Sequence, residues 1–137
     1  MHNSKFKFWD KTKRNWLFSD ITLGSWSIKD IMLLLSFTNR LKNFNRLGDI
    51  SILEYTKTVD RFNAELFEGD IIQPLRDIGR GWGKGLNFTI IYDEVHNRWG
   101  ANWKGHGKGT SAFFITRANT KNVKKVGNIF ENLDLIK

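Results

Sequence analysis

Basic residues alternate with glycine in two stretches of the chain, and the first also holds a tryptophan, a combination typical of surfaces that bind nucleic acid. Residues 79–85 read Gly-Arg-Gly-Trp-Gly-Lys-Gly, and residues 104–109 read Lys-Gly-His-Gly-Lys-Gly. Lysine and arginine neutralise phosphates, tryptophan stacks on bases, and glycine lets the backbone approach a strand closely. With the segment between the two stretches, the candidate nucleic-acid-binding residues are Arg80, Trp82, Lys84, Arg98, Trp99, Trp103, Lys104, His106 and Lys108.

A structural interpretation competes with this one. Trp99 and Trp103 lie four residues apart on a predicted strand, so their side chains share one face and would fit a core. The neighbouring lysines would then be ordinary solvated side chains. Trp82 is flanked by glycines on both sides and is the hardest of the three to explain as a core residue.

Three carboxylates, Glu65, Glu68 and Asp70, cluster around Gly69 in the stretch Glu-Leu-Phe-Glu-Gly-Asp-Ile-Ile, residues 65–72. A carboxylate pair can serve as general acid and base. The alternation of acidic and apolar residues instead favours solvent-facing strand positions, with Asp70 accepting hydrogen bonds in a turn. We therefore predict no catalytic residues here.

The segment Asp93-Glu94-Val95-His96 holds potential metal ligands, but the other two histidines give no ligand spacing, so a turn is favoured. Neither glycine-rich stretch is a P-loop, because Gly85 and Gly109 stand where that motif has serine or threonine. The sequence thus predicts a protein that is not an enzyme and has no metal site and no cofactor.

Several short strands must position these residues. The pattern predicts strands at 5–10, 16–18, 51–56, 65–72, 86–92, 98–103, 111–116 and 124–130, with a break at Gly69, an end at Pro74 and a turn at 119–122. Short strands separated by glycine and asparagine turns are typical of a small barrel or roll. We expect a mainly β protein, with a minor α contribution, folded as a single domain over residues 1–137.

One helix is expected near residues 28–47, with Ser27 as its N-cap and Gly48 at its end. Its apolar face is wider than packing on one small sheet demands. The extra width belongs either to the core or to a surface for a partner or a second copy of the chain. The candidate partner-binding residues are Met32, Leu33, Phe37 and Phe44.

Composition limits the class of protein. The 137 residues include no cysteine, which excludes disulfides and thiolate metal sites, and the net charge is +8. Residues 1–46 and 79–137 each carry a basic surplus of six, whereas residues 47–78 are acidic by four. Such a surface favours polyanions or an acidic protein, although ordinary solubility is an equal explanation. The apolar run at 31–35 is too short to span a membrane, and we expect a cytoplasmic protein without a signal peptide.

Three separated motifs resemble the YopX family of phage and prophage proteins. They are Lys-Phe-Lys-Phe-Trp-Asp-Lys at 5–11, Leu-Glu-Tyr-Thr at 53–56 followed by Leu-Phe-Glu-Gly-Asp-Ile-Ile at 66–72, and Val-Gly-Asn-Ile-Phe-Glu-Asn at 126–132. The motif residues are Trp9, Asp10, Tyr55, Glu68, Gly69, Asp70, Gly127 and Asn128. The resemblance implies an SH3-like, mostly β domain encoded by phages of mainly Gram-positive bacteria, and it implies no activity. Two positions depart from the family pattern: Lys57 replaces the glycine after Tyr-Thr, and Asn63-Ala64 replaces an Asn-Gly turn.

Two functions follow as hypotheses. In the first, the chain is a non-enzymatic phage accessory protein that binds a macromolecule, preferably single-stranded nucleic acid at the basic and aromatic loops. In the second, it is an inhibitor that binds a host protein through the apolar helix and an exposed tryptophan, as an anti-defence or host-takeover factor. Both place it in the cytoplasm of the infected bacterium.

Overall fold

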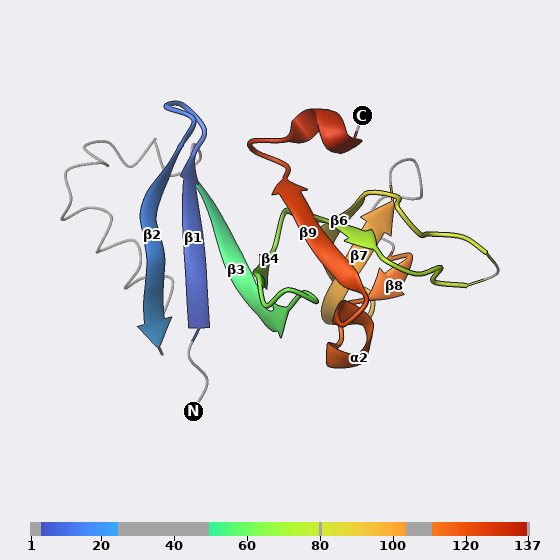
Figure 1. Ribbon diagram of the computed structural model, residues 1–137. Coiled ribbons are helices and arrows are strands. Elements are labelled where there is room, and N and C mark those ends of the chain that lie inside the picture. The colour runs from blue at the N-terminus through green and yellow to red at the C-terminus, as the bar shows by residue number, and fades with distance from the viewer. Residues whose placement is uncertain (1–3, 25–49, 80, 104–110, 137) are drawn as a thin grey trace. The chain divides into compact units, whose positions relative to one another are not determined.

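The computed structural model describes residues 4–24, 50–79, 81–103 and 111–136, which form strands, turns and two short helical segments (Figure 1). One sheet has the strand order β2-β1-β3-β4 and the other β8-β7-β6-β5-β9. The predicted mainly β class is confirmed. The chain divides into two compact units, residues 1–54 and 55–137, and each is described separately below.

In the first unit, β1 (Ser4–Asp10) pairs antiparallel with β2 (Asn15–Gly24) and with the first half of β3 (Ile50–Val59). The alternation of basic and aromatic residues in β1 leaves Phe8 fully buried. The ring of Trp9 packs edge to face on that of Trp16, with 4.8 Å between ring centroids. Aromatic pairs of this kind across a hairpin stabilise the sheet by about 0.2–1 kcal/mol each.

The motif residue Asp10 builds the turn between β1 and β2. Its Oδ1 accepts hydrogen bonds from the backbone N–H groups of Thr12, at 2.9 Å, and Lys13, at 3.0 Å. The N–H of Arg14 donates to the carbonyl oxygen of Asp10 at 2.7 Å, and Arg14 has a φ of 53°. Asp10 is therefore a structural residue, 3% exposed.

The second unit contains the remaining strands. The second half of β3 pairs with β4 (Glu65–Phe67). The five-stranded antiparallel sheet is built from β5 (Asp70–Pro74), β6 (Phe88–Asp93), β7 (Arg98–Trp103), β8 (Phe113–Phe114) and β9 (Val123–Asn128). Two short helical segments, α2 (Arg117–Thr120) and the 3-10 helix η2 (Leu133–Ile136), complete it.

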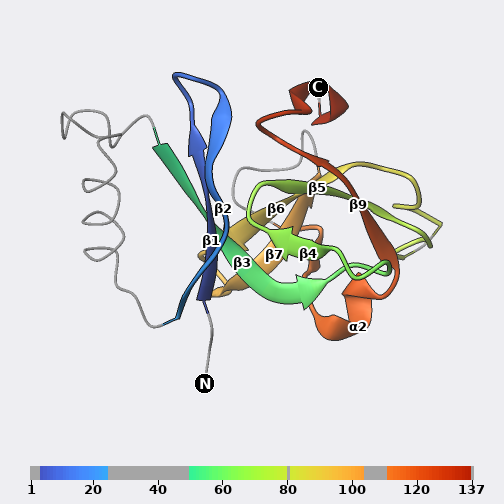
Figure 2. The same cartoon turned by 60° about the vertical axis from the view of Figure 1, so that its left-hand side comes forward.

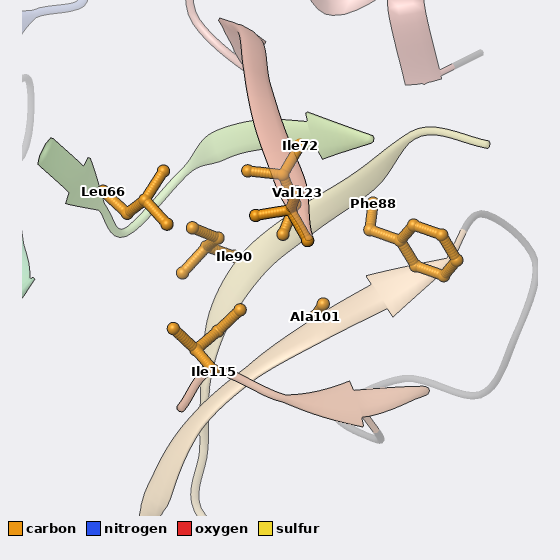
Figure 3. Packing of buried hydrophobic residues seen from close by; sticks show 7 residues of the cluster. All are labelled: Leu66, Ile72, Phe88, Ile90, Ala101, Ile115 and Val123. Carbon is orange, nitrogen blue, oxygen red and sulfur yellow. The ribbon is translucent and has the colours of Figure 1, made fainter. Parts of the chain in front are cut away.

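Alternating apolar residues of these strands form one core. Figure 3 shows it converging from β4, β5, β6, β7 and β9, and its members are Leu66, Ile72, Phe88, Ile90, Ala101, Ile115 and Val123. None of the seven is more than 8% exposed. Ile78, Leu86 and the side chains of Trp99, Trp103 and Phe113 pack against this core while remaining partly exposed.

The predicted break at Gly69 is a turn between β4 and β5, and Gly69 has a φ of 84°. Asp70 closes the turn, because its Oδ2 accepts a hydrogen bond from the N–H of Phe67 at 2.7 Å. The same oxygen lies 3.2 Å from Nζ of Lys125. Glu68 is half-buried beside it.

The motif at 126–132 is a second turn. Oδ1 of Asn128 accepts from the N–H groups of Phe130 and Glu131, at 3.0 and 2.8 Å. Oδ1 of Asn132 accepts from the N–H of Asn128 at 3.2 Å. A side chain at Gly127 would collide with Asn132, so this position requires glycine.

Three expectations differ from the structure or lie outside it. The turn predicted at 119–122 overlaps α2, which ends at Thr120 and whose N-cap Thr116 accepts a hydrogen bond from the N–H of Asn119. The strand predicted at 111–116 is only Phe113–Phe114. The predicted helix at 28–47, with Met32, Leu33, Phe37 and Phe44, lies outside the described residues. Across the described ranges, no helix has the length and hydrophobicity needed to cross a membrane.

Candidate nucleic-acid interface

The loop that carries Trp82 joins β5 to β6 and is closed by its own hydrogen bonds. The N–H of Ile78 donates to the carbonyl oxygen of Trp82 at 2.8 Å, and the N–H of Trp82 donates to the carbonyl oxygen of Gly79 at 3.0 Å. Gly83 has a φ of 112°, and a side chain there would collide with Ile78. The glycines thus allow a tight turn that presents the tryptophan.

Trp82 is the outermost member of an aromatic cluster made of Trp82, Phe88, Trp103 and Phe113. Its ring packs edge to face on Trp103 and on Phe88, with centroids 5.5 and 5.6 Å apart. Phe88 is fully buried and packs in turn on Phe113 at 5.2 Å. Trp82 remains 37% exposed. A partly exposed indole that packs on two other rings offers a surface on which a base can stack.

Only part of the predicted set gathers here. Lys84 is exposed on the same loop, and its N–H donates to Oδ1 of Asp77 at 3.3 Å. Trp103 faces Phe88 at one end of the β6–β7 hairpin, whereas Arg98 faces Asp93 at the other. The two ends are five residue steps apart along the strand, or roughly 17 Å. Arg98 and Trp99 therefore lie apart from Trp82.

Arg98 and Trp99 have other partners at their end of the hairpin. The guanidinium of Arg98 lies 4.1 Å from the ring centroid of Phe114. Trp99 packs edge to face on Tyr92, with ring centroids 5.2 Å apart. The core interpretation holds in part for Trp99 and Trp103, which both pack against the core. Four other predicted residues lie outside the described part of the chain: Arg80, Lys104, His106 and Lys108.

Asp93 organises the turn at that end and is fully buried. Its Oδ2 lies 2.9 Å from Nδ1 of His96 and accepts a hydrogen bond of 2.9 Å from the hydroxyl of Ser111, while Oδ1 accepts from the N–H of His96. Burial raises the pKa of Asp93, but the hydrogen bonds from His96 and Ser111 outweigh it, and the pKa is lower than usual.

This arrangement is structural. Ser111 donates to the carboxylate instead of to the imidazole, so His96 does not activate it as a nucleophile. No group of three or more potential metal ligands occurs within residues 4–24, 50–79, 81–103 and 111–136.

A basic hollow that the sequence motifs did not indicate lies elsewhere on the second unit. It has a volume of about 670 Å³. Its lining residues are Lys57, Thr58, Val59, Asp60, Arg61, Asn63, Arg117, Thr120 and Lys121. The cations come in two pairs far apart in sequence, and Lys121 follows Arg61 by 60 positions. Each pair alone is ordinary, so only knowledge of the β3–α2 neighbourhood would have revealed the hollow.

A smaller hollow of about 290 Å³ lies between the Trp82 loop and the α2 turn. Arg76, Asp77 and Ile78 line it from the loop, and Asn119 and Asn122 line it from the α2 side. Ile78 is the residue that closes the Trp82 turn, and Asn119 and Asn122 flank two lining residues of the basic hollow. The smaller hollow is thus lined by residues that neighbour each of the two sites in sequence.

The family model described as YopX protein matches residues 5–137 of this chain. Among solved structures, the chain is similar to the crystal structure of protein EF1440 from Enterococcus faecalis. The two chains are 17% identical, the match covers 100% of each, and the TM-score is 0.59. At that identity the likeness shows a common fold. No curated protein matches the chain.

Proposed function

Because the chain belongs to the YopX family, and membership alone assigns no activity, we propose its function from its geometry: it binds single-stranded nucleic acid, without catalysis, at the aromatic cluster. The observation that carries the proposal is the position of Trp82, 37% exposed at the tip of a turn and packed on Trp103 and Phe88. As a phage-encoded accessory protein, the chain would act in the cytoplasm of the infected bacterium.

Stacking is the interaction that this geometry favours. A base that stacks on a tryptophan gains about 1–3 kcal/mol, largely without regard to sequence. The two supporting rings fix the indole before binding, so little side-chain entropy is lost when a base arrives. Lys84 on the same loop and Arg76 in the neighbouring hollow are exposed cations for the adjoining phosphates.

The alternative proposal is that Trp82 anchors a host protein. Exposed tryptophans are common hot spots of protein interfaces, and Trp82 has the required exposure. The apolar residues Met32, Leu33, Phe37 and Phe44, which the sequence places on a helix, are separate candidate contacts for a host factor or for a second copy of the chain. The experiment below separates the two proposals.

We would titrate the protein into fluorescently labelled single-stranded DNA, duplex DNA and RNA and follow anisotropy at low and near-physiological salt. Trp82→Ala should weaken single-strand binding about tenfold, the loss of one stacked base. Tyr92→Ala is the matched control, because Tyr92 is 42% exposed but packs on Trp99, outside the cluster. It should bind as the wild type does.

Two results would overturn the nucleic-acid proposal. One is binding that disappears at near-physiological salt and is the same for Trp82→Ala and wild type, which would reduce the interaction to attraction of a polyanion by net charge. The other is equal weakening by Trp82→Ala and Tyr92→Ala. Either result would leave the host-protein proposal as the explanation of the exposed tryptophan.

A further inference from the structure

The basic hollow has two walls that meet at one end of the second unit. The end of β3 and the turn after it supply Lys57 and Arg61, and α2 with the turn after it supplies Arg117 and Lys121. Figures 1 and 2 show the end of β3, α2 and the start of β9 together at this end. Nη1 of Arg61 donates a hydrogen bond of 3.4 Å to the carbonyl oxygen of Lys121, which joins the walls.

The charges that line the hollow are not balanced. Four cations face a single carboxylate, that of Asp60. This carboxylate is 5% exposed and already accepts three backbone hydrogen bonds, from Phe62, Ala64 and Lys125. Within the described ranges, no carboxylate forms an ion pair with Lys57, Arg117 or Lys121. Among the described residues, the hollow therefore has a surplus of cations, which would attract an anion.

The backbone of the first wall is held in an uncommon conformation. Lys57 has a φ of 66° and Asn63 a φ of 67°, both in the left-handed region. The pairing of β3 with β4 is irregular between Tyr55 and Val59, on either side of Lys57. A left-handed lysine is disfavoured, and such strain tends to persist where it positions a side chain for a ligand.

The lining residues also define the ligand. Among the residues that the structure describes, no aromatic side chain lines the hollow, so these residues offer no surface on which a base would stack. Two guanidinium groups offer paired donors that match the oxygens of a phosphate, and two ammonium groups add point charges. Thr58 and Asn63 supply uncharged polar groups at the same wall.

We propose that the basic hollow is a phosphate-binding site, distinct from the aromatic cluster, that takes the phosphate groups of a nucleotide or of a nucleic-acid backbone. Its volume of about 670 Å³ accommodates more than one phosphate group. The proposal does not depend on stacking at Trp82, and either site could exist without the other.

Lys57→Gly is the decisive variant, because it removes one cation and also relieves the left-handed backbone. Arg14→Gly is the matched control: Arg14 is an exposed cation with a φ of 53°, and it does not line the hollow. We would measure pyrophosphate binding by calorimetry at constant ionic strength. Lys57→Gly should weaken it at least fivefold with no fall in melting temperature, and Arg14→Gly should leave it unchanged. Arg117→Ala, which alters the opposite wall, should weaken it similarly.

The source of the phosphate is tested with two further probes, ADP and an abasic deoxyribose-phosphate oligomer. Saturable ADP binding that Lys57→Gly weakens supports a nucleotide site. Tighter binding of the oligomer, weakened by the same variant, supports a backbone site. Trp82→Ala should leave pyrophosphate binding unchanged, which separates this proposal from the one above. Absence of pyrophosphate binding to the wild type, or an equal loss in Lys57→Gly and Arg14→Gly, would overturn the phosphate site.

Discussion

Buried aspartates recur at the turns of this protein. Asp10, Asp60, Asp70 and Asp93 are each no more than 5% exposed, and each accepts at least one backbone N–H. A buried carboxylate is tolerated when such donors surround it. These residues therefore hold the backbone in place, and this is the structural role of the two motif aspartates, Asp10 and Asp70.

Asp93 gives a prediction about acid stability. Its pKa is lower in the folded protein than in the unfolded chain, since the hydrogen bonds from His96 and Ser111 outweigh burial. Such a group stabilises the fold above its unfolded pKa of about 3.9 and loses that contribution as the pH falls through the folded value. Melting temperatures measured from pH 7 to pH 2 should therefore fall below about pH 4.

Asp93→Asn tests the assignment of that fall. The variant should be less stable than the wild type at pH 7, because it loses the charge-assisted hydrogen bonds. Its melting temperature should then change less steeply below about pH 4. Parallel curves for the two proteins would show that other carboxylates cause the acid sensitivity. Asp134→Asn, at an exposed position in η2, should follow the wild-type curve.

At the scale of elements, Asp60 joins the β3–β4 turn to β9. Its Oδ1 accepts from Phe62 and Ala64 at 2.8 and 2.9 Å, and Oδ2 accepts from Lys125 at 2.8 Å. Asp60→Ala would leave three N–H groups without their acceptor, and should lower the free energy of unfolding by about 2–4 kcal/mol. Chemical denaturation would measure this loss.

The matched control for that experiment is Asp134→Ala, an exposed aspartate that should change the free energy of unfolding by less than about 0.5 kcal/mol. Asp60→Asn should fall between the two, because its amide oxygen can still accept the turn hydrogen bonds. A loss of under about 1 kcal/mol for Asp60→Ala would mean that water replaces the carboxylate, and that the turn does not depend on it.

Sequence patterns were informative where they were long and regular. The alternation at residues 5–10 and the paired runs at 86–92 and 98–103 predicted β1 and the β6–β7 hairpin. They failed at α2, because a four-residue helix is too short to show helical periodicity and its N-cap Thr116 lies in a predicted strand. Glycine was not needed at residue 64, because Asn63 itself adopts the left-handed conformation of the turn.

The candidate site was predictable only where its residues were neighbours in sequence. The glycines around Trp82 indicated an exposed tryptophan, and it is exposed. The spacing of four residues on one strand suggested a shared role for Trp99 and Trp103. In the hairpin, however, Trp103 pairs with Phe88 and Trp99 with Tyr92, so of the two tryptophans Trp103 is the one that contacts Trp82. The basic hollow could not be predicted, because its walls are distant in sequence and neither contains a recognisable motif.

At the scale of the whole molecule, a net charge of +8 attracts any polyanion at low salt. The slope of the logarithm of the binding constant against the logarithm of the salt concentration separates this attraction from stacking. For a single strand, the magnitude of this slope decreases by about 0.7 for each phosphate that the protein no longer neutralises. Trp82→Ala should weaken binding of single-stranded DNA with an unchanged slope, since tryptophan carries no charge. Lys84→Ala should reduce the slope.

Anisotropy titrations at four or five salt concentrations would measure the slope for Trp82→Ala and for Lys84→Ala. Lys13→Ala is the control, because it removes one exposed cation from the turn after β1. It should leave the slope nearly unchanged, provided that the strand contacts the proposed surfaces. If Lys13→Ala and Lys84→Ala reduced the slope equally, the DNA would be held by diffuse charge, and no particular surface would be responsible.

Asp60 accepts a hydrogen bond from the N–H of Lys125 in β9, and Arg61 donates one to the carbonyl oxygen of Lys121. These two contacts have a consequence for the chain during its synthesis. A ribosome delivers the acidic central segment and β3 well before residues 117–125, so the nascent chain at first presents Lys57 and Arg61 without the opposite wall. The second wall can form only after residues 117–121 have emerged, because these residues supply it. Contacts between segments this distant in sequence close a long loop, so we expect them to form late in folding. Under the phosphate-binding proposal, a half-made chain would therefore lack the complete site that captures a nucleotide or messenger RNA.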